Sequence, residues 1–181
     1  MIHFLPTLIL SLTMQANSNN SPKTTDTSSM NTARQPPRFF KLSPISSETA
    51  VNEISTYTED FDPKYKITQE FKDTLLENLN SRTEELYDEN GRINAASTCR
   101  GFLNVPDCTT QSGQDIIRQV IGKGGCYFHM TTQNTGIDFI WHDRAQNKFF
   151  FWGTKFPIIR AMKIIDRRIT IVTNRMTVTE P

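Results

Sequence analysis

Three glycines and one lysine, Gly122-Lys123-Gly124-Gly125, stand between two short segments of helical character. Glycine adopts positive φ angles without steric cost, so such a turn lets the backbone lie against a ligand with no Cβ between them. Backbone N–H groups at the start of the next helix, the helix dipole and the Lys123 ammonium all favour an anion. The pattern therefore predicts phosphate binding, and a nucleic-acid backbone is the first candidate ligand.

Other reactive residues lack the spacing that catalysis or metal binding requires. Cys99, Cys108 and Cys126 form neither a C-x-x-C nor a Cys/His pattern, so we expect no metal site and no paired disulfide framework. The chain has no H-E-x-x-H motif, and G-K-G-G lacks the spacing of a complete phosphate-binding P-loop. The sequence favours a protein that is not an enzyme and holds no cofactor.

The elements that must position the loop can be read from the hydrophobic pattern. A short helix follows the loop, with Phe128 as its first core residue and Thr135-Gly136 as its end. Residues 137–141 alternate, which predicts a strand with Ile137 and Trp141 facing the helices and Ile140 on the other face. On this assignment Trp141 is core, and a change at Asp138 should have little effect on stability.

In their order and spacing these elements resemble a type I K-homology (KH) domain, whose G-x-x-G loop clamps the backbone of about four nucleotides. The resemblance covers roughly the C-terminal 70 residues and rests on Val120 to Gly125, Phe128, Thr135-Gly136, Ile137 to Trp141, Phe149 to Gly153, Ile158, Ala161 and Ile165. Three features depart from the family pattern: Arg118 replaces a small residue, residues 106–115 form a long connection, and Thr131 occupies an aliphatic position.

The resemblance implies an α+β fold in which a three-stranded sheet packs on three helices, with the first strand near residues 101–105. It also implies a groove beside the loop for single-stranded RNA or DNA. The candidate binding residues are Gly122, Lys123, Gly124, Gly125, Arg118, Ile121, Ile137, Ile140, Arg144 and Lys148. Tyr127 and His129 are weaker candidates, and we expect the strand aromatics to be core rather than base-stacking residues.

Four regions follow from this interpretation. Residues 1–37 form an arm with a short apolar start, and residues 15–35 within it are too polar to repay the entropy of ordering, so we expect disorder. Residues 38–92 form an acidic, partly helical extension, residues 93–170 the KH-like domain, and residues 171–181 a tail. Within the extension, Thr68 as N-cap and apolar residues at helical spacing predict one helix over 68–88.

Charge is divided between these regions. Residues 48–90 hold twelve acidic and four basic residues, a net charge of −8, whereas residues 99–169 hold ten basic and five acidic residues, a net charge of +5. A basic module suits a polyanion. The acidic segment could compete for the basic groove, but segregated charge is usually a solvated face, and we favour that interpretation.

The first residues carry a weak targeting signal. Residues 4–12 are apolar but interrupted by Pro6, and they are too short to span a bilayer. No basic residue precedes them, and the cysteine count is odd, which suits secretion poorly. We therefore expect an intracellular protein of cytoplasm or nucleus with no membrane partner, while secretion stays an alternative.

The sequence thus predicts non-catalytic binding of single-stranded RNA, or of single-stranded DNA. The alternative is a KH-like protein-interaction or structural module that binds no nucleic acid and uses an acidic helix, with its stripe of Phe71, Leu75 and Leu79, to contact a protein partner. A third hypothesis is an accessory domain of an RNA-processing enzyme. Small aromatic-rich KH-like chains of this kind also resemble products of large DNA viruses.

Overall fold

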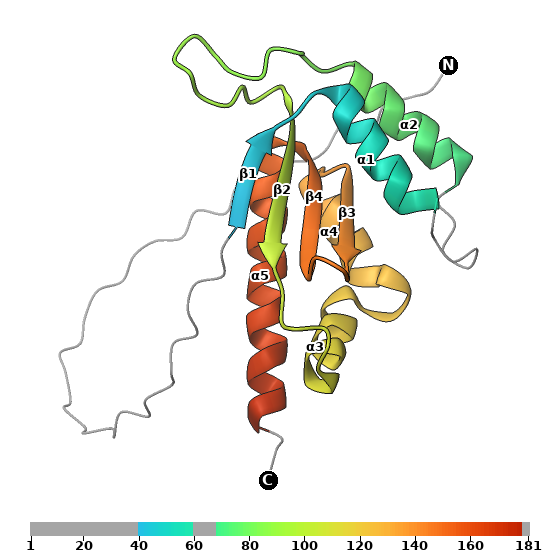
Figure 1. Cartoon of the computed structure of the whole chain (residues 1–181), viewed down its shortest axis with the longest axis vertical. Coiled ribbons are helices and arrows are strands. Elements are labelled where there is room, and N and C mark those ends of the chain that lie inside the picture. Colours follow the sequence, from blue (N-terminus) through green and yellow to red (C-terminus); the bar gives the residue numbers. More distant parts are fainter. Residues whose placement is uncertain (1–39, 60–67, 179–181) are drawn as a thin grey trace, which may run out of the picture. The chain divides into compact units, whose positions relative to one another are not determined.

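The computed structural model describes residues 40–59 and 68–178, which belong to one compact unit. The predicted disordered arm and the apolar segment 4–12 lie outside the described residues. Along the chain the elements are β1 (Phe40–Pro44), α1 (Ser47–Glu59), α2 (Gln69–Asn80), β2 (Thr98–Asn104), α3 (Gln111–Ile121), the short 3-10 helix η2 (Lys123–Gly125), α4 (Cys126–Thr135), β3 (Phe139–Asp143), β4 (Lys148–Thr154) and α5 (Lys155–Val178) (Figure 1).

The strands form one antiparallel sheet in the order β1-β2-β4-β3, which confirms an α+β fold. The prediction of three strands was wrong, because β1 adds a fourth at the edge of β2, and the first predicted strand is longer than expected. Strand β1 is short and ends in Pro44, and proline is tolerated at a sheet edge. Its strand conformation depends on pairing with β2. No local pattern in the sequence predicts this pairing.

One face of the sheet packs against α3, α4 and α5, with α5 running along the sheet in Figure 1. The predicted core positions of the last helix, Ile158, Ala161 and Ile165, are buried here. Thr131 is also buried, and its hydroxyl donates to the Tyr127 carbonyl at 2.7 Å. That hydrogen bond explains how a polar residue occupies a position where an aliphatic one was expected.

The other face of the sheet is covered by α1 and α2. Ala50 and Ile54 from α1 and Leu75 and Leu79 from α2 form a second core with Phe139, Phe150 and Trp152. Glu53 on α1 accepts hydrogen bonds from the Trp152 indole N–H at 2.9 Å and from Arg100. Because both faces are covered, β4 is buried on every residue from Phe149 to Gly153, as expected for a strand inside two layers.

The predicted face assignment of β3 was wrong. Ile137 and Ile140 belong to the core with α3, α4 and α5, whereas Phe139 and Trp141 lie on the face that α1 and α2 cover. The strand begins only at Phe139, and Gly136 before it has a left-handed φ of 69°. Ile137 therefore precedes the strand and does not share its alternation.

Three predicted boundaries also differ from the structure. Thr68 caps α2 as expected, accepting from the Phe71 N–H at 3.2 Å, but the helix ends at Asn80 rather than at residue 88. Helix α3 already begins at Gln111, so the connection before it is shorter than expected. The predicted tail is helical as far as Val178, because α5 continues with Ile169 and Val172 buried.

The segment that follows α2 is held by a tertiary contact. Beyond Ser81, the Arg82 guanidinium forms a bidentate ion pair with the Asp138 carboxylate, with both N–O distances 2.7 Å. The Arg82 and Asp138 side chains are only 13% and 6% exposed. The expectation that Asp138 contributes little was therefore wrong, since this pair ties the segment after α2 to the start of β3.

Candidate nucleic-acid interface

The glycine loop joins the end of α3 to the start of α4. Gly122 has φ 81° and ψ 167°, a region that essentially only glycine adopts, and its N–H donates to the Arg118 carbonyl at 2.8 Å. Gly124 and Gly125 also have positive φ values of 61° and 77°. The loop thus has the local geometry that its glycines predicted.

The three glycines differ in what surrounds them. A Cβ at Gly122 would collide with the Tyr127 ring and lie 2.6 Å from Cys126 Sγ, whereas one at Gly124 or Gly125 would meet nothing within 4 Å. Gly122 is therefore needed for close internal packing. Gly124 and Gly125 leave open space beside the backbone, and Lys123 between Gly122 and Gly124 is exposed. A ligand can reach this part of the main chain.

An open groove runs from the loop along α4 to the edge strand β3 and the β3–β4 turn. Most of the predicted binding residues line it: Arg118, Ile121, Gly122, Lys123, Gly124, Gly125, Ile137, Ile140 and Arg144. Arg118 is exposed on α3 and pairs with Asp115 at 3.1 Å, and Arg144 is exposed in the turn. Basic side chains thus border the groove at the loop and at the turn.

Two predicted residues, Ile137 and Ile140, are buried at 4% and 6% exposure. They support the base of the groove from the core more than they offer surface to a ligand. Lys148 does not line the groove; its ammonium lies 4.6 Å from the centre of the Phe102 ring. Phe102 packs against the core with α1 and α2, so Lys148 belongs to the other face of the sheet.

His142 on β3 lies beside Phe149, with the ring centroids 5.1 Å apart in an edge-to-face arrangement. Burial, with a smaller contribution from Arg144, lowers the pKa of His142 to about 4, so the imidazole is neutral at pH 7. Next to it, Asp143 accepts from the Tyr57 hydroxyl at 3.0 Å, and burial and Asp143 raise the pKa of Tyr57 to about 12. Helix α1 is thereby tied to the turn that borders the groove.

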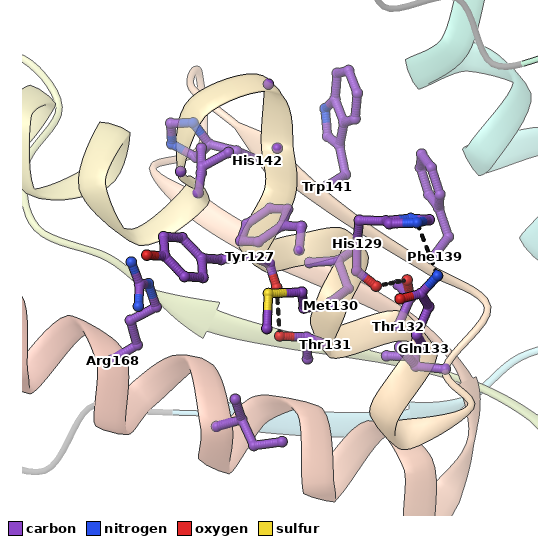
Figure 2. A pocket seen from close by; sticks show the side chains of 18 of the residues that line it. Tyr127, His129, Met130, Thr131, Thr132, Gln133, Phe139, Trp141, His142 and Arg168 are labelled. Carbon is purple, nitrogen blue, oxygen red and sulfur yellow. Dashed lines mark hydrogen bonds between the residues drawn. The ribbon is translucent and has the colours of Figure 1, made fainter.

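The sequence did not point to α5 as a contributor to the site. Arg167, Arg168 and Arg175 line the same open groove on its α5 side. Figure 2 shows Arg168 beside Tyr127, whose ring centre lies 3.1 Å from the guanidinium carbon. Tyr127 itself was a weak candidate. An i, i+7 spacing of arginine from 168 to 175 is the signal in the sequence, but it indicates only a shared helix face.

Apolar side chains are exposed beside these arginines. Tyr127 and Met130 on α4 are 37% and 52% exposed, and Ile164 and Ile171 on α5 are 41% and 42% exposed. All four line the groove. Figure 2 shows Tyr127, His129 and Met130 projecting from α4. The surface around α4 therefore combines cationic groups with apolar area.

Within residues 40–59 and 68–178, no group of three or more His, Cys, Asp and Glu side chains could hold a metal ion. In the same described ranges, every helix is too short or too polar to cross a membrane. Cys99 is buried, Cys108 is partly buried and Cys126 is exposed at the start of α4, and all three are free thiols. Comparisons with family models, with curated proteins and with solved structures found no match.

Proposed function

We propose that this protein binds single-stranded nucleic acid, RNA or DNA, without catalysis, through the loop Gly122–Gly125 and the groove beside it, on a fold of the type I KH kind. The observation that carries the proposal is the loop itself: an exposed lysine, followed by two glycines with open space beside their backbone, at the N-terminus of α4. A helix N-terminus with accessible main chain favours a phosphate.

The topology supports the KH-like part of the proposal. Strands β2, β4 and β3 are adjacent in that order, with α3, the loop and α4 between β2 and β3 in sequence, and α5 after β4. The order of these elements along the chain is the one that the resemblance implied. Strand β1 and the helices α1 and α2 are additions to it, and they cover the face of the sheet away from α3, α4 and α5.

The charge around the groove supports a polyanionic ligand. Lys123, Arg118, Arg144 and Arg167 are exposed along its lining. A single strand is held by a basic groove that follows its backbone. We further propose that the protein acts inside the cell, where its three free thiols stay reduced.

The second candidate is protein binding by the same KH-like fold. The predicted partner stripe of Phe71, Leu75 and Leu79 no longer supports it, because Leu75 and Leu79 are buried against the sheet. The observation in its favour is the exposed apolar area of Tyr127, Met130, Ile164 and Ile171, since such area marks many interfaces.

Binding of labelled single-stranded RNA and DNA homopolymers, measured over a range of salt concentrations, tests the proposal. We expect Lys123→Glu to weaken binding and to reduce the salt slope by roughly 0.7, the value for one phosphate contact on a single strand. The double change Lys123→Asp, Gly124→Asp should abolish binding while leaving the circular dichroism spectrum unchanged.

The matched control is Lys41→Glu, which makes the same charge change on an exposed lysine of β1, at the sheet edge opposite β3. This variant should keep wild-type affinity and slope. If Lys123→Glu and Lys41→Glu have the same effect, the loop is only a turn. If the wild-type protein binds neither polymer at low salt, the protein-binding candidate replaces the proposal.

A further inference from the structure

We infer that Arg168 of α5 is a positioning residue for the phosphate loop: through Tyr127 and the end of α3, it holds Gly122 in the conformation that binding requires. The inference rests on the proposed function and extends it to a residue outside the loop. By sequence alone Arg168 is indistinguishable from the other arginines of α5.

The contacts of Arg168 fix its guanidinium in three ways. Nε donates to the Val120 carbonyl at 3.0 Å, and Nη2 donates to the Gln119 carbonyl at 2.8 Å. The guanidinium carbon lies 3.1 Å from the centre of the Tyr127 ring (Figure 2). A planar fork that donates twice and also stacks is specific to arginine, since a lysine ammonium cannot reproduce this geometry.

Tyr127 connects this guanidinium to the loop. Its ring packs so closely beside Gly122 that an added Cβ there would collide with it. The ring thus lies between Arg168 and the glycine whose φ of 81° and ψ of 167° turn the chain from α3 into η2. Moving the guanidinium would free both the ring and the last turn of α3, on the two sides of Gly122.

Electrostatics gives the same contacts a second effect. The C-terminus of a helix carries bare carbonyls and a partial negative charge, which opposes an approaching phosphate. Helix α3 ends at the loop, and Arg168 covers the carbonyls of Gln119 and Val120 in its last turn. With that end of α3 neutralised, the positive N-terminus of α4 dominates the field at Gly124 and Gly125.

Three variants of α5, measured with the same homopolymers, separate positioning from simple charge. Arg168→Met removes the fork and the charge, and we expect it to weaken binding about tenfold, the scale of one lost charge-assisted hydrogen bond. Arg168→Lys keeps the charge and should weaken binding almost as much. Arg160→Met is the matched control: it removes one exposed positive charge from α5 at a residue that does not line the groove, and it should have a much smaller effect.

The salt slope distinguishes a positioning residue from a residue that contacts phosphate directly. A positioning residue leaves the slope unchanged, whereas a lost phosphate contact lowers it by roughly 0.7. Three results would each overturn the inference: rescue by Arg168→Lys, a reduced slope in Arg168→Met, or equal losses in Arg168→Met and Arg160→Met. If Arg168→Met does not fold, Tyr127→Leu replaces it, because this change removes the ring but leaves the Gln119 and Val120 contacts in place.

A ligand-free measurement distinguishes this inference from the proposed function. The amide resonances of Gly122, Gly124 and Gly125 should shift in Arg168→Met and stay in place in Arg160→Met, whether or not nucleic acid binds. Unchanged glycine resonances in Arg168→Met contradict this inference but not the proposed function. Absence of binding by the wild-type protein contradicts the proposed function, and the glycine shifts still decide whether Arg168 holds the loop.

Discussion

At the scale of single residues, the Arg82–Asp138 pair shows that the contribution of a charged residue to stability depends on its partner. By its sequence neighbours Asp138 is an ordinary polar residue within the predicted strand 137–141. In the structure its carboxylate is 6% exposed and faces a guanidinium that is 13% exposed. Removing one partner of a buried pair leaves the other charged and unpaired, which is far more costly than losing an exposed pair.

We therefore predict that Asp138→Ala lowers the free energy of unfolding by about 3 to 5 kcal/mol. The control is Asp115→Ala, which breaks the Asp115–Arg118 pair, whose side chains are 37% and 69% exposed, and should cost less than about 1 kcal/mol. Urea denaturation followed by tryptophan fluorescence measures both. Similar midpoints for the two variants would show that the Asp138 pair is screened by water and would refute the assignment.

At the scale of elements, the acidic extension is part of the fold. Strand β1 pairs with β2, and α1 and α2 supply four aliphatic residues to the core on the aromatic face of the sheet. Without them, Phe139, Phe150 and Trp152 would lose their cover. Large apolar faces of this kind cause aggregation when they are exposed.

A chain that starts at Asn94 should consequently melt at a much lower temperature than the full chain and should bind a hydrophobic dye. The matched control is a truncated chain that starts at Arg38 and keeps every described element, so it should melt like the full chain. Circular dichroism and dye fluorescence measure the two properties. If the chain that starts at Asn94 melts at the same temperature as the full chain, then α1 and α2 are dispensable and their packing on the sheet is weak.

At the scale of the whole molecule, the structure shows where the acidic residues of α2 lie relative to the sheet and the groove. Helix α2 buries Leu75 and Leu79 against the sheet, so its apolar side is occupied, and its acidic residues Glu70, Asp73 and Glu77 are exposed. The same helix borders the groove through Phe71, Thr74 and Asn78. The solvated acidic face that we favoured from the sequence is the observed one, and it leaves these acids to act on a ligand only at a distance.

Neutralising these acids by the triple change Glu70→Gln, Asp73→Asn, Glu77→Gln should therefore strengthen single-strand binding only about two- to threefold at low salt, and not at all at high salt, because solvent ions screen exposed charges. The control neutralises Glu84, Glu85 and Glu89, which are exposed in the segment after α2 and do not line the groove. A gain of about a hundredfold or more would instead mean that the acids compete directly for the groove.

The sequence by itself determined the features that depend on near neighbours. The positive φ of Gly122 and Gly124, the N-cap of Thr68 and the end of α4 at Gly136 all follow from residues within one helical turn. The order of β2, α3, the loop, α4, β3, β4 and α5 also follows, because each element carries its own period of apolar residues. These features include the loop on which the proposed function depends.

Only the tertiary structure decided what depends on distant partners. Arg82 and Asp138 are 56 residues apart in sequence, and Arg168 and Val120 are 48 apart. Strand β1 exists because β2 lies beside it, and Trp141 faces α1 and α2 because the chain turns at Gly136 before β3 begins. Local propensity carries no information about such pairings, since each requires two segments to meet after the chain has folded.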